Sequence, residues 1–102
     1  MKVAIINYGM GNVASVEKAV NYLGHKAIIT NDAFEINEAD CILLPGVGAF
    51  AQGMENLIKY GLVDILNKEV IINKKPFLGI CLGMQLLASK GFEPFETVGL
   101  GW

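Results

Sequence analysis

The sequence predicts an α/β fold with three layers, in which helices cover both faces of a mainly parallel sheet. Short, continuous apolar runs such as Val3–Ile6 and Cys41–Leu44 are typical of strands that are buried on both faces. These runs alternate with segments whose apolar residues recur at helical spacing, and turn-forming residues separate the two. Strands that alternate with helices form βαβ units, which make neighbouring strands parallel.

The first strand, Val3–Ile6, leads through a glycine-containing turn into a helix. Asn12 is a suitable N-cap for this helix, because its side chain can accept a hydrogen bond from the first turn. Gly24 is a suitable stop, because glycine tolerates the left-handed conformation that ends many helices. The helical spacing depends on the apolar residues Val13, Val16, Val20 and Leu23.

Two more strands follow in the middle of the chain. Ala27–Ile29 is a short apolar run that ends at the turn-forming residues Asn31 and Asp32. Residues Ala33–Ala39 show no clear period, and we expect an irregular stretch there. Cys41–Leu44 is the third strand, and the proline and glycine that follow it end the run.

The second half of the chain predicts two helices, Phe50–Tyr60 and Leu62–Asn73, with Gly61 between them. The charged residues at the end of the second helix are expected to form a solvated face. They are Lys68, Glu69, Lys74 and Lys75. Pro76 opens a fourth strand, which runs directly into a helix that begins at Leu82. The periodic pattern is lost beyond Lys90.

The composition indicates a folded domain with a substantial core. The apolar fraction is 53% and the charged fraction is 18%, which is unlike a disordered chain. A net charge of −2 argues against a nucleic-acid partner, and no apolar run approaches the roughly 18 residues of a membrane span. The two cysteines do not make a disulfide framework, which fits a reducing cytoplasm. No metal-ligand spacing is present, and we expect no metal and no cofactor.

The turns after three of the predicted strands are unusual in composition. They are Tyr8–Asn12, Pro45–Gly48 and Gly79–Gly83. Ligands of parallel α/β folds bind outside the carboxyl ends of the strands. We therefore expect these three turns to converge on one crevice.

The turn Gly79–Gly83 has the form Gly-x-Cys-x-Gly between a strand and a helix. This spacing is typical of a nucleophile elbow, in which the nucleophile sits on a strained turn and its neighbours must lack bulk. The N-terminus of the following helix would stabilise a thiolate. Cys81 is therefore predicted to be a catalytic nucleophile. The alternative is a small buried cysteine at the end of a core strand.

Two backbone amides are candidates for an oxyanion hole. Glycines on both sides of Val47 would let its peptide rotate, so that its N–H faces the same pocket as Cys81. The N–H of Leu82 would supply a second donor for a developing oxyanion. The alternative for this segment is an ordinary strand-to-helix turn. Gln85 lies one helical turn beyond Cys81 and either lines the pocket or faces solvent.

Other features support weaker alternatives. Gly9, Gly11 and Ala14 follow a strand and precede Asp32, which outlines a dinucleotide-binding fingerprint. Esterase-like hydrolases and non-catalytic flavodoxin-like domains also remain open. The only histidine, His25, follows the first helix and is expected too far from Cys81 to be its base. Cys41 is predicted to be a buried packing residue.

The predicted elbow therefore has a nucleophile and oxyanion donors but no base. In parallel α/β enzymes with this elbow, the acid and the histidine follow the nucleophile in the chain. We therefore expect residues 1–102 to be the N-terminal part of a single domain in a longer polypeptide.

The segment Pro76–Leu87 resembles the nucleophile motif of the class I (triad) glutamine amidotransferases. Tyr8–Asn12, Leu44–Phe50 and Gly99–Trp102 are similar to segments of the glutaminase subunits of imidazole glycerol phosphate synthases. The resemblance implies a flavodoxin-like amidotransferase fold that is truncated on its C-terminal side. It also implies that the triad histidine and glutamate lie beyond these residues, so that this segment alone would be inactive.

The resemblance further implies that Cys81 attacks the side-chain amide of glutamine and forms a thioester. Val47 and Leu82 would match the oxyanion-hole amides, and Gly46, Gly48 and Gln85 would match positions that bind glutamine. Ammonia would pass to a synthase subunit, a cyclase-type (βα)8 barrel of histidine biosynthesis, which would contact Tyr8–Asn12. Related amidotransferases supply ammonia for amidino sugars of surface polysaccharides. Most members of the histidine pathway carry a Ser/Glu-rich stretch where this chain has Ala88–Glu93, and this difference leaves the polysaccharide pathway open.

Overall fold

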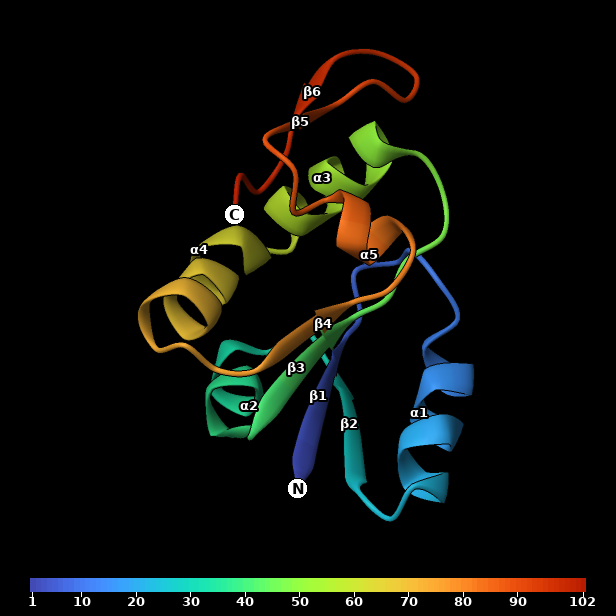
Figure 1. Cartoon of the computed structure of the whole chain (residues 1–102), viewed down its shortest axis with the longest axis vertical. Coiled ribbons are helices and arrows are strands. Elements are labelled where there is room, and N and C mark those ends of the chain that lie inside the picture. The colour runs from blue at the N-terminus through green and yellow to red at the C-terminus, as the bar shows by residue number, and fades with distance from the viewer.

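A four-stranded parallel sheet forms the centre of the molecule in the computed structural model, which describes residues 1–102 (Figure 1). The strand order is β2-β1-β3-β4, and every neighbouring pair is parallel. The strands are β1 (Lys2–Ile6), β2 (Lys26–Thr30), β3 (Cys41–Leu44) and β4 (Phe77–Gly79). A separate antiparallel pair, β5 (Lys90–Gly91) and β6 (Thr97–Val98), follows near the end of the chain.

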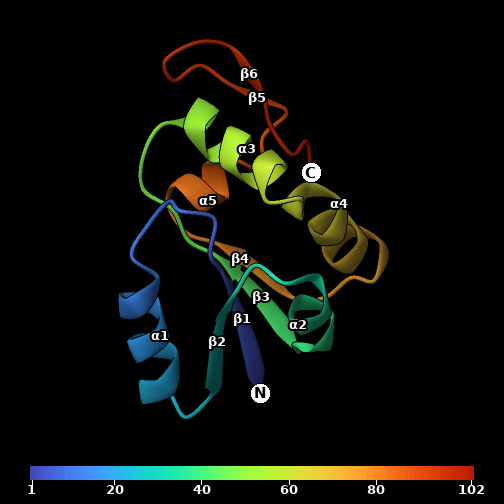
Figure 2. The same ribbon diagram turned by 180° about the vertical axis from the view of Figure 1, so that it is seen from behind.

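Helices lie on both faces of the sheet, so the three-layer prediction is confirmed (Figures 1 and 2). One face carries α1 (Val13–Tyr22), and the other is covered by the remaining helices. These are α2 (Ala33–Glu38), α3 (Phe50–Lys59), α4 (Leu62–Leu66), the π-helical segment η1 (Asn67–Ile72) and α5 (Leu82–Gln85). No helix has the length and apolar character needed to cross a membrane.

The alternation of side chains along β1 explains the two cores. Ala4 and Ile6 face the larger core, which α2, α3, α4 and α5 complete. Val3 and Ile5 face the smaller core with Val20 of α1. Successive side chains of a strand point to opposite faces, so a strand covered on both sides must be apolar throughout. This confirms the interpretation of the continuous apolar runs as buried strands.

Both expected ends of α1 are confirmed. The Asn12 side chain accepts a hydrogen bond from the N–H of Ser15 at 3.1 Å, as an N-cap does. Gly24 follows the last turn with a φ of +87°, which a residue with a Cβ adopts only with strain. The two ends are encoded locally, and that is why the sequence identifies them.

The expected irregular stretch at residues 33–39 is wrong, because α2 lies there. Asp32 is its N-cap and accepts a hydrogen bond from the N–H of Glu35 at 3.0 Å. The helix has six residues and buries only Ile36, so it offers too few apolar positions for a helical period to be recognised. The sequence signal for this helix was Asp32, a residue type that commonly caps helix N-termini.

The predicted solvated face is wrong for Glu69 and Lys75, whereas Lys68 and Lys74 are exposed as expected. The Glu69 side chain is 1% exposed, and Asn37 Nδ2 donates to it at 2.6 Å and Asn73 Nδ2 at 3.1 Å. The Lys75 ammonium lies 3.7 Å from the Glu69 carboxylate. It donates to the carbonyls of Asn37 in the last turn of α2 and of Ala39, the C-cap of that helix, each at 2.6 Å. The hydrogen bond from Asn37, more than any nearby charge, lowers the pKa of Glu69 below its usual value.

Candidate functional site

The three unusual turns meet at the carboxyl edge of the sheet, beside α5 (Figure 1). A Cβ on Gly11 would lie 3.0 Å from the Cα of Gly46, so the first two turns are in close contact. A Cβ on Gly48 would lie 2.6 Å from the Met10 methyl group. The third turn joins them through a hydrogen bond from the N–H of Leu82 to the carbonyl of Gly46, at 3.1 Å. The convergence expected from a parallel sheet is therefore present.

Cys81 occupies the turn between β4 and α5 in a strained conformation. Its φ is 53° and its ψ is −118°, a combination that costs a residue with a side chain about 1–3 kcal/mol. The cysteine is exposed, so the turn presents its sulfur at the surface rather than within the core. Strain at an exposed nucleophilic side chain is the geometry expected of a nucleophile elbow.

The two glycines of the elbow are required by close packing. A Cβ on Gly83 would collide with the Leu44 carbonyl of β3, and one on Gly79 would lie 2.8 Å from the backbone N and Cα of Met84. The chain can therefore pass from β4 into α5 only if both positions lack a side chain. The sequence expectation that the neighbours of Cys81 must lack bulk has this physical cause.

The backbone amides of the elbow are already engaged. Leu82 donates to the Gly46 carbonyl, and Gly83 donates to the Ile80 carbonyl at 3.0 Å. The expected pair of free oxyanion donors is thus absent from this arrangement of the turns. Val47 is 70% exposed, and its N–H has no backbone partner.

The other predicted site residues lie around Cys81. Gln85 is exposed, and its backbone N–H donates to the Cys81 carbonyl at 3.1 Å, which places it one turn further along. Gly48 is exposed, whereas Gly46 is buried under the elbow. The structure therefore brings the candidate residues Gly46, Val47, Gly48, Cys81, Leu82 and Gln85 together at one edge of the sheet.

Two residues that anchor the first turn were overlooked in the sequence. Asn56 Nδ2 donates to the Tyr8 carbonyl at 2.9 Å, and Gln52 Nε2 donates to Asn56 Oδ1 at 2.8 Å. Both lie on α3 one helical turn apart. The sequence offered one signal for this contact. Asn56 is a polar residue next to Leu57, on a helix whose apolar residues pack on the larger core.

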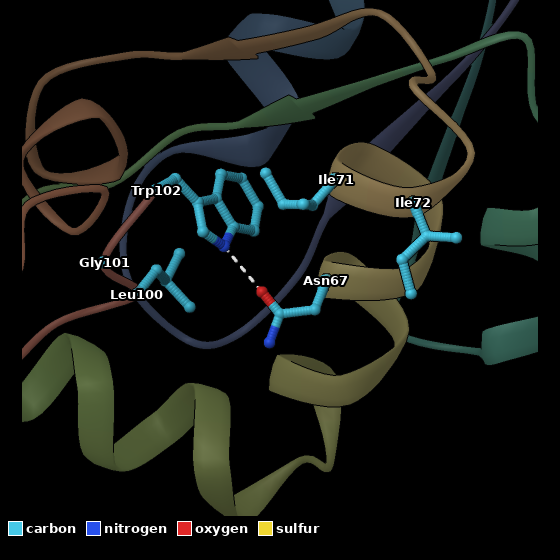
Figure 3. Close-up of a pocket in the computed structure, with 6 residues that line it drawn as sticks. All are labelled: Asn67, Ile71, Ile72, Leu100, Gly101 and Trp102. Atoms are coloured by element: carbon cyan, nitrogen blue, oxygen red, sulfur yellow. Dashed lines mark hydrogen bonds between the residues drawn. The ribbon is translucent and has the colours of Figure 1, made fainter.

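Cys81 lines none of the three surface hollows. The largest has a volume of about 460 Å³ and lies between η1 and the last residues of the chain (Figure 3). The indole N–H of Trp102 donates to Asn67 Oδ1 across it at 2.6 Å. The candidate site therefore lies on the exposed surface where the three turns meet, and not in one of these hollows.

The dinucleotide-binding alternative is not favoured by this geometry. The Asp32 carboxylate is used as the N-cap of α2, so it is engaged in the helix rather than free for a ribose. Gly11 packs against the backbone of Gly46, so the absence of a side chain there serves the contact between two turns. Both features have structural roles here.

The remaining chemical candidates are far from Cys81 or poorly suited to attack. His25 is exposed in the connection that precedes β2, at the amino edge of the sheet. Cys41 lies in β3 and is half-buried rather than fully buried, beside a shallow hollow of about 250 Å³. Burial, with a contribution from the Asp40 charge, raises the pKa of the Cys41 thiol, which makes it a weak nucleophile at neutral pH.

Comparison with known proteins identifies relatives along the whole chain. Residues 4–94 match the class-I glutamine amidotransferase family. The imidazole glycerol phosphate synthase subunit HisH 2 of Vibrio vulnificus is 50% identical over 100% of this chain and 48% of its own length. The imidazole glycerol phosphate synthase subunit HisH of Caldanaerobacter subterraneus is 54% identical over 96% of this chain and 48% of its own.

The chain thus spans about half the length of the curated relatives it matches. A crystal structure of a glutamine amidotransferase has the same fold, with a TM-score of 0.74 and 19% identity over 95% of this chain and 51% of that one. The family match covers all three turns, including the elbow that carries Cys81. The chain belongs to the class-I glutamine amidotransferase family.

Proposed function

We propose that the complete protein is a glutaminase subunit that supplies ammonia to a synthase subunit making imidazole glycerol phosphate in histidine biosynthesis. The observation that carries this proposal is the exposed, strained Cys81, one hydrogen bond away from the Gly46 turn. The relatives named above are subunits of imidazole glycerol phosphate synthase. They favour this pathway over an amidino-sugar pathway.

In this reaction the Cys81 sulfur attacks the carbonyl carbon of the glutamine side-chain amide. The carbon–nitrogen bond then breaks, ammonia leaves, and a glutamyl thioester remains on the sulfur. Water attacks the thioester, releases glutamate and restores the thiol. A base must accept the thiol proton and return a proton to the departing amine. Because His25 lies at the opposite edge of the sheet, we expect that base in the half of the relatives that this chain does not span.

The tetrahedral intermediates carry an oxyanion that needs donors. Rotation of the Gly46–Val47 peptide would place the Val47 and Leu82 amides on the same side, each close to the carbonyl under attack. Removing one such donor typically lowers the rate by a factor of about 10²–10³. Gly46, Gly48 and Gln85 surround the nucleophile and are proposed to position the glutamine.

We further propose that these residues form the N-terminal part of one amidotransferase domain, which works in the cytoplasm without a cofactor. Its partner would be a (βα)8-barrel synthase subunit that docks near Tyr8–Asn12. This turn is adjacent to the Gly46 turn, so a partner bound there would lie next to the donors of the oxyanion hole.

The proposal is tested by assaying the complete protein together with its synthase subunit. Cys81→Ala should abolish glutamine hydrolysis, and a glutamine-like electrophile should label Cys81 and be blocked by glutamine. Cys41→Ala is the matched control, because the raised pKa of that thiol makes it a weak competitor for the reagent. Glutaminase activity that survives Cys81→Ala would contradict the proposal. Labelling by small esters but not by the glutamine analogue would favour an esterase.

A further inference from the structure

A hydroxyl group without a partner lies beneath the candidate site. Tyr8 is 0% exposed, and its hydroxyl is the only buried side-chain nitrogen or oxygen atom that makes no hydrogen bond. Buried polar atoms in folded proteins are nearly always paired, so an exception calls for a physical reason. The proposed mechanism above does not use this group.

The hydroxyl sits directly against Gly46, the first residue of the peptide that would rotate. A Cβ placed on Gly46 would collide with the Tyr8 hydroxyl, so the hydroxyl fills the space of a Gly46 side chain. Gly46 itself is buried. The Tyr8 backbone is held by the hydrogen bond from Asn56, and its ring belongs to the larger core. The position of the hydroxyl is therefore fixed by the fold.

Rotation of the Gly46–Val47 peptide creates a need for a new donor. The Gly46 carbonyl now accepts the Leu82 amide, and it loses that partner when the peptide turns over. A buried carbonyl without a donor is costly. Val47 now has a negative φ, and a simple rotation would carry it towards positive φ, which β-branched residues avoid. The rotated state therefore needs a stabilising contact.

We propose that Tyr8 is a positioning residue whose hydroxyl donates to the Gly46 carbonyl when the Gly46–Val47 peptide has rotated, which holds the Val47 and Leu82 amides towards the substrate. The inference rests on the proposed glutaminase function. In the present arrangement the Gly46 carbonyl accepts from the Leu82 amide and the Tyr8 hydroxyl is unpaired. In the rotated arrangement the same carbonyl would accept from the Tyr8 hydroxyl, and the Leu82 amide would be free. Burial raises the pKa of Tyr8 above its usual value, so the hydroxyl keeps its proton at neutral pH.

The test is Tyr8→Phe in the complete protein with its synthase subunit, with Cys81→Ala in the same assay. Tyr8→Phe should lower kcat for glutamine hydrolysis roughly tenfold to a hundredfold and change KM little, because the donors act on the oxyanion of the reaction. Alkylation of Cys81 by a haloacetamide forms no oxyanion and should keep its wild-type rate. The matched control is Tyr22→Phe on α1, where the ring is 91% exposed.

Loss of the hydroxyl leaves no new unpaired group, so the Tm of Tyr8→Phe should stay at the wild-type value or rise. A wild-type kcat in Tyr8→Phe overturns the inference and leaves the proposed function standing, provided that Cys81→Ala is inactive. A lower Tm with equal losses in hydrolysis and alkylation also overturns it, because it shows a packing role. Activity in Cys81→Ala overturns both the proposed function and the inference.

Discussion

A buried polar side chain is fully paired at the amino edge of the sheet, whereas one at the carboxyl edge has no hydrogen-bond partner. At the amino edge, Glu69 is fully enclosed, and both of its carboxylate oxygens are paired by Asn37, Asn73 and Lys75. At the carboxyl edge, the Tyr8 hydroxyl has no partner and Cys81 adopts a strained φ. Every polar group of the first region that is named here is paired, whereas the second keeps an unpaired hydroxyl and a strained backbone.

The difference separates stability from reactivity. A buried charge with complete pairing locks α2, η1 and the start of β4 together, and it has no reason to change. Strain and unpaired atoms persist only where the surrounding structure enforces them, and they concentrate at functional sites. Changes around Glu69 at the amino edge should therefore lower stability with little effect on turnover, and changes in the turns around Cys81 at the carboxyl edge should do the reverse. All predictions concern the complete protein.

After the loss of the nucleophile in Cys81→Ala, Val47→Pro should cause the next largest effect on turnover. Proline removes the N–H and holds φ near −65°, so the rotated peptide can no longer supply its donor. We expect kcat to fall by a factor of about 10²–10³. The free energy of unfolding should change little, because the side chain is 70% exposed. Val47→Ala, which keeps the amide, should lose far less activity in the same assay. Equal activity of the two variants would contradict the oxyanion role.

Glu69→Ala should have the largest effect on stability. It leaves Lys75 without its carboxylate and two asparagine amides without an acceptor. Breaking a buried ion pair in this way costs about 3 kcal/mol, to be measured by denaturant unfolding. Turnover per folded molecule should remain near the wild-type value. A lower kcat in fully folded Glu69→Ala protein would contradict the idea that the amino edge affects stability and the carboxyl edge affects turnover.

The same carboxylate should make stability depend on pH. Since its pKa is lowered in the folded protein, Glu69 contributes stability above its unfolded pKa. That contribution is lost as the pH falls through the folded pKa. Unfolding measured from pH 6 downwards should show a loss of stability on the acid side of the usual glutamate range. Glu69→Gln should flatten this part of the curve, and an unchanged slope would mean that other carboxylates cause it.

Asp32→Ala should have the smallest effect. The Asp32 side chain caps α2 by accepting from the N–H of Glu35, and loss of such a cap costs about 1 kcal/mol. Kinetic constants for glutamine should not change, because the cap follows β2 and the elbow follows β4, and these are the two outer strands of the sheet. An altered affinity for a dinucleotide would instead revive the nucleotide-binding alternative.

Local features were predictable wherever a few neighbouring residues carry the whole signal. The strands are continuous apolar runs, Asn12 and Gly24 mark the ends of α1, and two glycines at fixed offsets identify the turn that presents Cys81. Even the meeting of three turns follows from the rule that parallel strands end at one edge. Each of these inferences needs only backbone geometry and burial of apolar side chains.

Tertiary contacts decided what the polar groups do. Glu69 has the sequence context of a solvated helix end, yet Asn37 from a helix 32 residues earlier encloses it. The Leu82 amide was expected to be free, yet the Gly46 carbonyl of another turn accepts it. The Tyr8 hydroxyl stands against that same residue, with no signal in its own neighbours. A hydrogen bond depends on which atoms the fold brings within about 3 Å. Sequence spacing therefore identified Cys81, and the fold determined which groups around it are engaged.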